Sequence, residues 1–388
     1  VRLYGRLTAT GTAARTSLYY GDTDGATDPL AWSHTVDFGW TTDGVAQVSH
    51  LICGLSSNST LYYTFRATNC VGEVWTASTN LVTPTYSDRL EISFCGYSGT
   101  ETLTNFPVLV QLGTNIPGFD YASFGSSAGG DLRFLNAEET DLLDHEIELW
   151  DTNGVSHVWV EVPALADPFS SIVARWGSSA TNFISSGTNG GPWSAEYRGV
   201  WHLGETVTDN TTSNAAHLDS STNAFHADQV RNGPVAGVVG NGQAFDGNND
   251  WIHYDYTSGL NPSEYTISTW VWVNASDLQA VIASIDDSSG YAIGYTSSSQ
   301  WLAELGKPGA NNNPQLQSSE AATPRQQWVH IAMSYDPSDS RARLWVNGQV
   351  VRERTDGSIR VASAGLPFQI GTVRSGDLEL NGYVDEVR

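Results

Sequence analysis

Basic side chains are scarce in this sequence. Its 388 residues contain 18 Lys and Arg against 42 Asp and Glu, a formal charge of −24, and Lys307 is the single lysine. A nucleic-acid-binding protein needs a basic face that neutralises phosphates, and anionic lipid attracts basic segments. The composition therefore argues against nucleic acid as a partner and disfavours an anionic membrane surface.

Cysteine and long apolar runs are also scarce. Cys53, Cys70 and Cys95 show neither a CxxC pair nor zinc-ligand spacing. One disulfide would leave an odd thiol, and we favour three buried free cysteines. No segment reaches the roughly 18 apolar residues of a membrane helix, so we expect no membrane insertion within this segment. Both ends read as strands, which predicts a piece of a longer extracellular or cell-surface polypeptide.

Helical periodicity is nearly missing, and alternation replaces it. The side chains alternate in character from one residue to the next in runs such as TLYYTFRAT, HVWVEV, YTISTWVWV and ARLWVNGQVV. These runs are rich in Val, Ile, Thr, Trp and Tyr. Gly, Asn, Asp and Ser turns separate them. This pattern predicts an all-β fold of tandem β-sandwiches.

Two linkers divide the chain. Residues 79–88 carry a proline after a strand, and residues 178–196 are rich in Ser, Gly and Asn. They predict three units at 1–85, 86–180 and 196–388.

The first unit contains Gly-Leu, a polar turn, Thr-x-Tyr and an alternating strand, followed by Asn-x-x-Gly. It resembles the fibronectin type III family, in which such domains are mostly spacers. The matching residues are Gly54, Leu55, Thr60, Tyr62, Phe65, Ala67, Asn69 and Gly72.

The second unit contains the segments NFPV, DLRF and HEIE and a later Trp-Gly. On these segments it is similar to an uncharacterised β-sandwich family of bacterial and archaeal surface proteins. Its Asp131, His145, Glu146 and Glu148 are candidates for acid–base chemistry. Glu146 and Glu148 share a strand face, whereas His145 points the other way. We interpret these carboxylates as ties between strands.

The third unit opens with GVWHLGE and continues with HLDSSTN, GQAFDG, WVHIA, LWVNG and a closing VDEV. It resembles the laminin-G-like, concanavalin A-like jelly roll in its bacterial form. In YTISTWVWV both faces are largely apolar, as in a sheet covered on both sides. We interpret Trp270 and Trp328 as core residues in preference to ligand platforms. Asn347-Gly348 predicts a tight hairpin.

The resemblance bears on catalysis, because some glycoside hydrolases share this fold. They carry a Glu-x-Asp-x-x-Glu strand, and retaining hydrolysis needs two carboxyls about 5–5.5 Å apart. The third unit contains no such strand and no Gly-x-Ser-x-Gly, His-Glu-x-x-His or phosphate-loop motif. We therefore expect no catalytic residues.

The resemblance also implies a structural calcium ion where the opening loop meets the last strand. Asp219 and Asp385 match those places, and calcium prefers such oxygen ligands. The alternative is that Asp219 caps its loop and Asp385 binds backbone amides.

A sugar site needs exposed aromatic rings with polar groups beside them. Tyr291 and Tyr295 share one strand face, Trp301 opens the next strand, and Asn312 lies in an amide-rich loop. These four are our predicted ligand-binding residues, with a neutral glycan as the ligand. Core packing of the three aromatic residues is the alternative.

Three functions fit these features. The first is a non-catalytic adhesion or carbohydrate-binding segment of a large bacterial surface or secreted protein, whose partner is a glycan or a neighbouring surface protein. The second is an accessory region of a polysaccharide-degrading enzyme whose catalytic domain lies outside this chain. The third is a self-assembling subunit of an extracellular filament.

Overall fold

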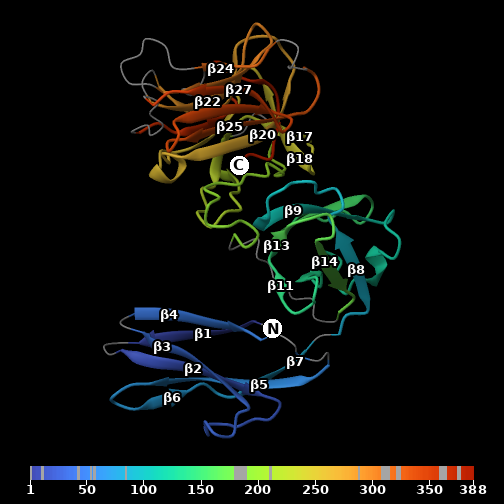
Figure 1. The fold of residues 1–388 in the computed structure, drawn as a ribbon, viewed down its shortest axis with the longest axis vertical. Helices are drawn as coiled ribbons and strands as arrows, with labels where there is room; N and C mark the ends of the chain where they lie inside the picture. The colour runs from blue at the N-terminus through green and yellow to red at the C-terminus, as the bar shows by residue number, and fades with distance from the viewer. Residues whose placement is uncertain are drawn as a thin grey trace. The chain divides into compact units, whose positions relative to one another are not determined.

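The structure is a computed structural model. It describes residues 2–9, 13–41, 44–52, 55, 58–83, 85–178, 190–208, 212–286, 289–306, 315–319, 325–357, 365–373 and 377–388. These residues form strands and two short 3₁₀ helices, η1 (Tyr121–Ser123) and η2 (Ser258–Leu260), with no α-helix among them. The predicted all-β class is therefore confirmed (Figure 1). None of the described helices is long and apolar enough to cross a membrane.

The chain forms two compact units. The first contains residues 1–104, 114–143 and 162–184, and the second contains residues 105–113, 144–161 and 185–388. Residues 86–180 thus contribute segments to both units. The three-unit division stays a prediction from the sequence.

In the first unit, two sheets enclose a small core. A two-stranded sheet pairs β1 (Arg2–Ala9) with β4 (Gly44–Leu51). The other sheet has the order β3 (His34–Thr41), β2 (Ala14–Gly21), β5 (Thr60–Thr68) and β6 (Glu73–Trp75), and β7 (Thr79–Val82) also pairs with β5. Leu3, Leu18, Ile52 and Leu61 are buried together. This unit also carries Cys70, which like Cys95 is free but exposed, so the expected burial of these two thiols is wrong; Cys53 lies outside the described residues.

Two further sheets follow along the chain. One has the order β11 (Leu142–Leu143), β10 (Arg133–Asn136), β14 (Ser171–Trp176) and β8 (Asp88–Ser93). The other has the order β12 (His145–Leu149), β13 (Val155–Leu165) and β9 (Leu103–Gly113). The pairing of β12 with β13 shifts register between Ile147 and Leu149.

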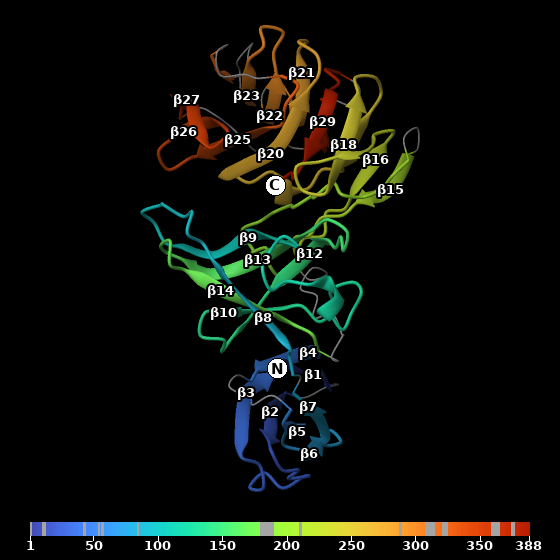
Figure 2. The same cartoon turned by 90° about the vertical axis from the view of Figure 1, so that its right-hand side faces the viewer.

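The largest part of the second unit is a pair of stacked sheets (Figure 2). The eight-stranded sheet has the order β15 (Thr212–His217), β16 (Ala227–Val230), β19 (Trp251–Tyr254), β28 (Phe368–Ile370), β21 (Gln279–Ile285), β22 (Gly290–Tyr295), β23 (Trp301–Leu305) and β24 (Gln315–Gln317). The seven-stranded sheet has the order β17 (Gly233–Ala236), β18 (Asn241–Asp246), β29 (Asn381–Asp385), β20 (Tyr265–Val273), β25 (Val329–Asp336), β26 (Arg341–Val346) and β27 (Gln349–Thr355). The closing strand β29 thus lies inside its sheet, between β18 and β20.

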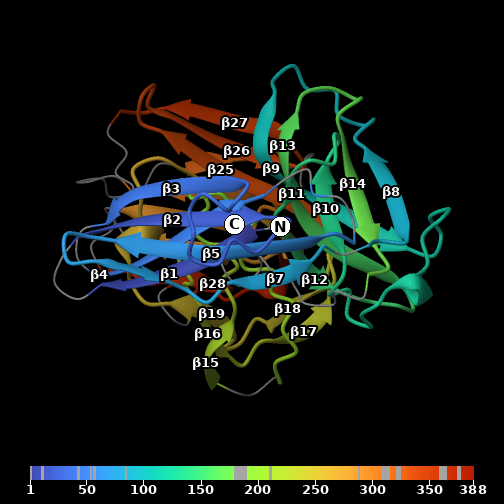
Figure 3. The same ribbon diagram turned by 90° about the horizontal axis from the view of Figure 1, so that it is seen from below.

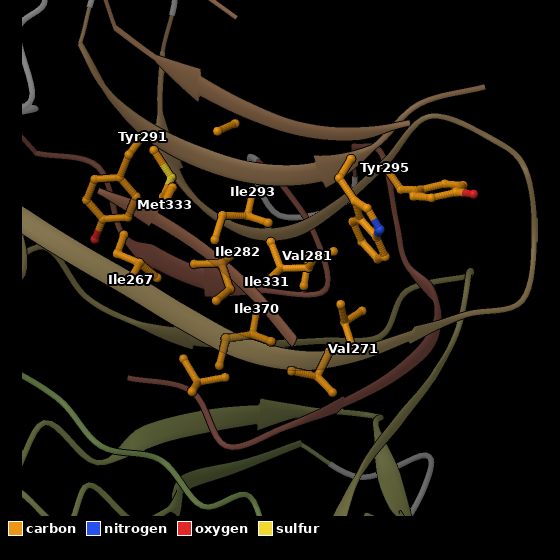
Figure 4. Packing of buried hydrophobic residues seen from close by; sticks show 14 of the residues in the cluster. Ile267, Val271, Val281, Ile282, Tyr291, Ile293, Tyr295, Ile331, Met333 and Ile370 are labelled. Carbon is orange, nitrogen blue, oxygen red and sulfur yellow. The ribbon is translucent and has the colours of Figure 1, made fainter. Parts of the chain in front are cut away.

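The core lies between these two sheets, and β20 shows how the sequence specifies it. Ile267, Val271 and Val273 are buried, whereas Trp270 and Trp272 on the opposite face are partly exposed. Figure 4 shows Ile267 and Val271 in the same buried cluster as Ile282 and Ile293. Burying such a side chain contributes about 1.5–3 kcal/mol. The strand itself is confirmed, but the expectation of a sheet covered on both faces is wrong, because Trp270 and Trp272 are partly exposed.

The hairpin prediction is confirmed as well. Asn347 and Gly348 both have positive φ, 47° and 76°, as a two-residue turn between twisted strands requires. They join β26 to β27, which lie side by side with β25 in Figure 3.

Candidate functional site

Three partly exposed aromatic side chains form a row across the outward face of the seven-stranded sheet. Trp272 on β20 pairs with Tyr383 on β29. On the other side of β20, Val271 pairs with Val329, so Trp328 is the next residue in register opposite Trp272. All three belong to the second unit, and none belongs to the buried core cluster between the sheets. We call them the aromatic row.

The three rings converge. The ring centroid of Trp272 lies 5.9 Å from that of Tyr383 and 6.2 Å from that of Trp328, and Trp328 and Tyr383 are also 6.2 Å apart. Neighbouring strands are about 4.8 Å apart, so β29 and β25, on either side of β20, are separated by about 9.6 Å. Because their rings are closer than that, Trp328 and Tyr383 lean toward each other around Trp272.

Two asparagine amides flank the aromatic row. Trp272 donates from Nε1 to Oδ1 of Asn274 at 2.9 Å, and Asn274 donates from Nδ2 to Oδ1 of Asn381 at 3.1 Å. An asparagine amide offers two N–H donors and an oxygen that accepts more than one bond. The two amides are therefore held in place and keep capacity for a hydroxyl group.

The neighbouring aromatic residues are packed differently. Trp270 contacts His330 edge to face, with ring centroids 5.3 Å apart. Burial lowers the pKa of His330, and the Arg388 guanidinium lowers it further. Trp345, on β26, donates from Nε1 to Oγ of Ser334 at 3.4 Å. The interpretation of Trp270 and Trp328 as core residues is wrong, because both lie on the outward face and are partly exposed.

The predicted sugar-binding aromatic residues lie elsewhere. Tyr291, Tyr295 and Trp301 are at most 2% exposed and belong to the core between the sheets. Figure 4 shows Tyr291 and Tyr295 in this core. Tyr291 donates its hydroxyl to the carbonyl of Leu260 at 2.7 Å. Tyr295 packs edge to face on Trp301, with centroids 4.8 Å apart. The expectation of an exposed floor is therefore wrong, because this strand face points inward; Asn312 lies outside the described residues.

The predicted calcium ligands are engaged by protein donors. Asp219 accepts from the amides of Val200, Ser221 and Phe225 and from the hydroxyl of Ser221, each at 2.8 Å. Asp385 accepts through Oδ2 from the amides of Val238 and Val239. Both aspartates are almost fully buried. The four donors on Asp219 do not fit a calcium ligand, and the calcium ion stays a prediction.

A second polar cluster surrounds the buried His202. Its Nδ1 lies 2.8 Å from Oε1 of Glu386 and 3.4 Å from Oε2 of Glu148, and its Nε2 lies 3.5 Å from Oε2 of Glu146. Arg388 forms an ion pair with Glu386. We call these five residues the His202 cluster.

Aromatic side chains surround the His202 cluster. Trp159 donates to Glu148 at 2.7 Å and Trp193 donates to Glu146 at 2.8 Å. The guanidinium carbon of Arg388 lies 4.3 Å from the ring centroid of Trp159 and 5.0 Å from that of Trp193. The cluster thus joins β12 and β13 to the opening and closing segments of the jelly roll.

Charge in the His202 cluster is balanced. Burial lowers the pKa of His202, but the carboxylates of Glu386 and Glu146 outweigh it and raise that pKa well above its usual value. Burial raises the pKa of Glu148 to about 9, and the Glu386 carboxylate adds to the rise. The pKa values of Glu146 and Glu386 fall despite burial, because His202 stabilises both carboxylates. At neutral pH two cations then face two carboxylates, and Glu148 carries a proton.

This balance explains the cluster without a metal ion. Potential ligand atoms of Glu148, His202 and Glu386 lie within 4.8 Å of one another. However, Arg388 and His202 already neutralise Glu386, and Trp159 binds Glu148. The side chains of His202 and Glu148 are only 9% and 5% exposed, which leaves little access for a substrate. The cluster is therefore structural in character.

The sequence revealed part of this cluster. Glu146 and Glu148 share a strand face, as predicted, and both approach His202. Their partners His202 and Glu386 were not predicted, because they lie 184 residues apart in the opening GVWHLGE and closing VDEV segments. Asp131, the other acidic candidate, ties two loops together. It accepts hydrogen bonds from the backbone N–H groups of Gly125, Ser126, Gly177 and Ser178.

Residues 246–388 match the model of the concanavalin A-like lectin/glucanases superfamily, Laminin_G_3. The resemblance of this region to a laminin-G-like jelly roll is confirmed. A comparison with curated proteins gave no match.

Three solved structures illustrate the structural likenesses. The binding domain of Paraclostridial Mosquitocidal Protein 1 aligns at 15% identity and a TM-score of 0.38, covering 48% of this chain and 47% of that one. The CBM40 of Ruminococcus gnavus IT-sialidase, bound to α2,3-sialyllactose, aligns at 12% identity and a TM-score of 0.33. This alignment covers 38% of this chain and 88% of that one. Domain 4 of AbnA, a GH43 extracellular arabinanase from Geobacillus stearothermophilus, in complex with arabinotriose, aligns at 18% identity and a TM-score of 0.32. This alignment covers 40% of this chain and 73% of that one. This chain spans about half the length of the first. With TM-scores below 0.5, these likenesses leave the function open.

Proposed function

We propose that this chain is a non-catalytic, carbohydrate-binding adhesion segment of an extracellular surface or secreted protein. The aromatic row of Trp272, Trp328 and Tyr383 is its sugar-binding surface, and a neutral glycan is its ligand. The observation that carries the proposal is this convergence of three partly exposed rings beside two fixed amides.

The chemistry of the aromatic row suits a sugar. A pyranose ring has an apolar face that packs on an aromatic ring and hydroxyl edges that need hydrogen bonds. Trp272, Trp328 and Tyr383 provide the first, and Asn274 and Asn381 provide the second. Amides carry no charge, which favours a neutral sugar. The match of residues 246–388 to a superfamily that includes lectins agrees with this proposal.

The carboxylates of the His202 cluster are poor candidates for hydrolysis. A glycosidase needs two carboxyls that reach the substrate from both sides of the bond it cleaves. Glu146, Glu148 and Glu386 are close together, but their side chains are only 13%, 5% and 1% exposed and are bonded to His202, Trp159 and Arg388. They are therefore poorly placed to act on a polysaccharide.

Binding is tested with the full chain on an array of neutral and acidic glycans, followed by calorimetry on the hits. Trp328→Ala should weaken binding by about tenfold or more, because it removes one aromatic face of the site. Trp345→Ala is the matched control, since Trp345 is a partly exposed tryptophan on the same face but outside the aromatic row. Equal affinity of Trp328→Ala and wild type, with both folded, would place the sugar elsewhere.

Catalysis is tested in parallel. Incubation of the full chain with plant and marine polysaccharides should release no new reducing ends. Reproducible release above a heat-denatured control would contradict the non-catalytic assignment.

A further inference from the structure

Apolar side chains join β9 and β13 to the segment that opens the jelly roll. Trp159 on β13 is buried in one cluster with Trp193 and Val200, and Leu109 on β9 and Tyr197 pack against it. The ring centroids of Trp159 and Trp193 lie 5.3 Å apart, and both residues are at most 8% exposed. Burial of large aromatic side chains is a main source of core stability. The five residues therefore form a small core to which both parts of the chain contribute.

Polar contacts connect the same two parts. The carboxylate of Glu146, on β12, accepts a hydrogen bond from the hydroxyl of Ser220 at 2.6 Å and another from Nε1 of Trp193 at 2.8 Å. The guanidinium of Arg388 lies over the ring of Trp159, 4.3 Å from its centroid. We call this contact of β9, β12 and β13 with residues 185–388, including the His202 cluster, the joint. Domains connected by a simple linker share few such contacts.

The closing segment of the jelly roll is shaped for the joint. Val384 and Val387 both belong to the core between the sheets, although regular alternation places residues three apart on opposite faces. Glu386, with its φ of 54°, interrupts the alternation between them. Asp385 then accepts from two backbone amides of the turn between β17 and β18, and Glu386 reaches His202. The end of β29 thus contributes to the core and to the joint at once.

We propose that the sheet of β9, β12 and β13 and the jelly roll fold and unfold as one cooperative unit, held together by the joint. Residues 105–113 and 144–161 are then an obligate part of the jelly roll, although a segment rich in Ser, Gly and Asn, residues 178–196, separates them from it in the sequence. These ranges lie in the same compact unit as residues 185–388, which supports the proposal. The inference goes beyond carbohydrate binding, and its test needs no ligand.

Native-state hydrogen exchange of the full chain tests the proposal. Mass spectrometry at increasing, sub-denaturing urea measures the opening equilibrium of each strand. In the wild type, the slowest amides of β12 and β13 should share one opening equilibrium and one urea dependence with those of β20 and β29. A single cooperative unit requires this agreement.

Two variants disturb the joint from the side of β12 and β13. Trp159→Ala removes the aromatic contact, and Glu146→Gln is a milder change that keeps the size of the side chain and removes its charge. Each should speed exchange in β20 and β29 by the same factor as in β12 and β13, about tenfold or more for Trp159→Ala. Val155→Ala is the control, because Val155 lies on β13 but is 39% exposed; its effect should stay below about twofold.

The outcomes are distinct. Faster exchange confined to β12 and β13, with β20 and β29 unchanged, would overturn the proposal, because the jelly roll would then be stable without the sheet. Two different opening equilibria in the wild type would overturn it as well, and this measurement decides the question even where a variant does not fold. Equal factors in all four strands support the proposal. No outcome depends on sugar binding, so this inference and the proposed function can fail separately.

Discussion

The imidazole of His202 lies 2.8 Å from the carboxylate of Glu386, which follows it by 184 residues in the chain. The contact joins the opening segment of the jelly roll to its closing segment. Glu386 has a φ of 54°, in the left-handed region that most residues avoid. In this conformation the Glu386 side chain binds both His202 and Arg388.

The first prediction is that stability falls as pH rises from about 4.5 to about 9. The folded state holds a proton on Glu148, whose pKa is raised from 4.5 to about 9, while the unfolded state has already released it. Because the folded state binds more protons, the free energy of unfolding decreases with pH. His202 adds to the decrease above pH 6.5, because its pKa is also raised. Urea unfolding between pH 4.5 and 9.5 measures the slope.

Glu146 and Glu386 change the stability at lower pH than Glu148 and in the opposite direction. Glu146 and Glu386 have lowered pKa values, so their contribution is lost only as pH falls below about 4.5. Asp385, next to them, has its pKa raised to about 7 by burial, and the Glu386 charge adds to the rise; it follows Glu148 in direction. Glu148→Gln should flatten the slope, since glutamine does not titrate. An unchanged slope in this variant would assign the pH dependence to other groups.

The second prediction concerns the removal of His202. His202→Ala should lower the free energy of unfolding by about 3–5 kcal/mol, because Glu146 remains buried without its cation and Glu386 keeps only Arg388. Arg343→Ala is the control, since it breaks a more exposed pair with Glu353 and should cost about 1 kcal/mol or less. Similar costs for both variants would show that the cluster contributes no more than a surface pair.

The sequence was sufficient to predict the strands but not which of their faces is buried. Along β20, alternation separates Ile267 and Val271 from Trp270 and Trp272, but both sets are apolar. The choice between them depends on the neighbouring sheet, which no local pattern encodes. The same ambiguity led to Tyr291 and Tyr295 being predicted as an exposed floor, although they face the core.

The aromatic row and the His202 cluster could not be predicted, because both depend on contacts between residues far apart in the sequence. The aromatic row needs Trp272, Trp328 and Tyr383, which come together only through the register of β29, β20 and β25. The spacing of Glu146 and Glu148 predicted a shared face, because a strand repeats every two residues. Their partners become visible only in the folded chain.

The third prediction tests calcium. The carboxylate of Asp219 is bonded to four protein donors at 2.8 Å each, so removing divalent cations should leave the melting temperature unchanged. Scanning calorimetry with and without EDTA measures it, with elemental analysis of the purified protein beside it. Bound calcium, together with a lower melting temperature after chelation, would support the ion predicted from the sequence, because a ligand of the folded state stabilises it.

The last prediction separates the core tryptophan from the binding tryptophan. Trp301 is completely buried, so Trp301→Ala opens a cavity and should cost about 3–5 kcal/mol of stability. The fraction that remains folded should bind glycan with wild-type affinity, because the aromatic row lies on the other sheet. Trp328→Ala should do the reverse, with a small change in melting temperature and a large loss of affinity. Loss of affinity in Trp301→Ala at an unchanged melting temperature would return the sugar site to β22 and β23.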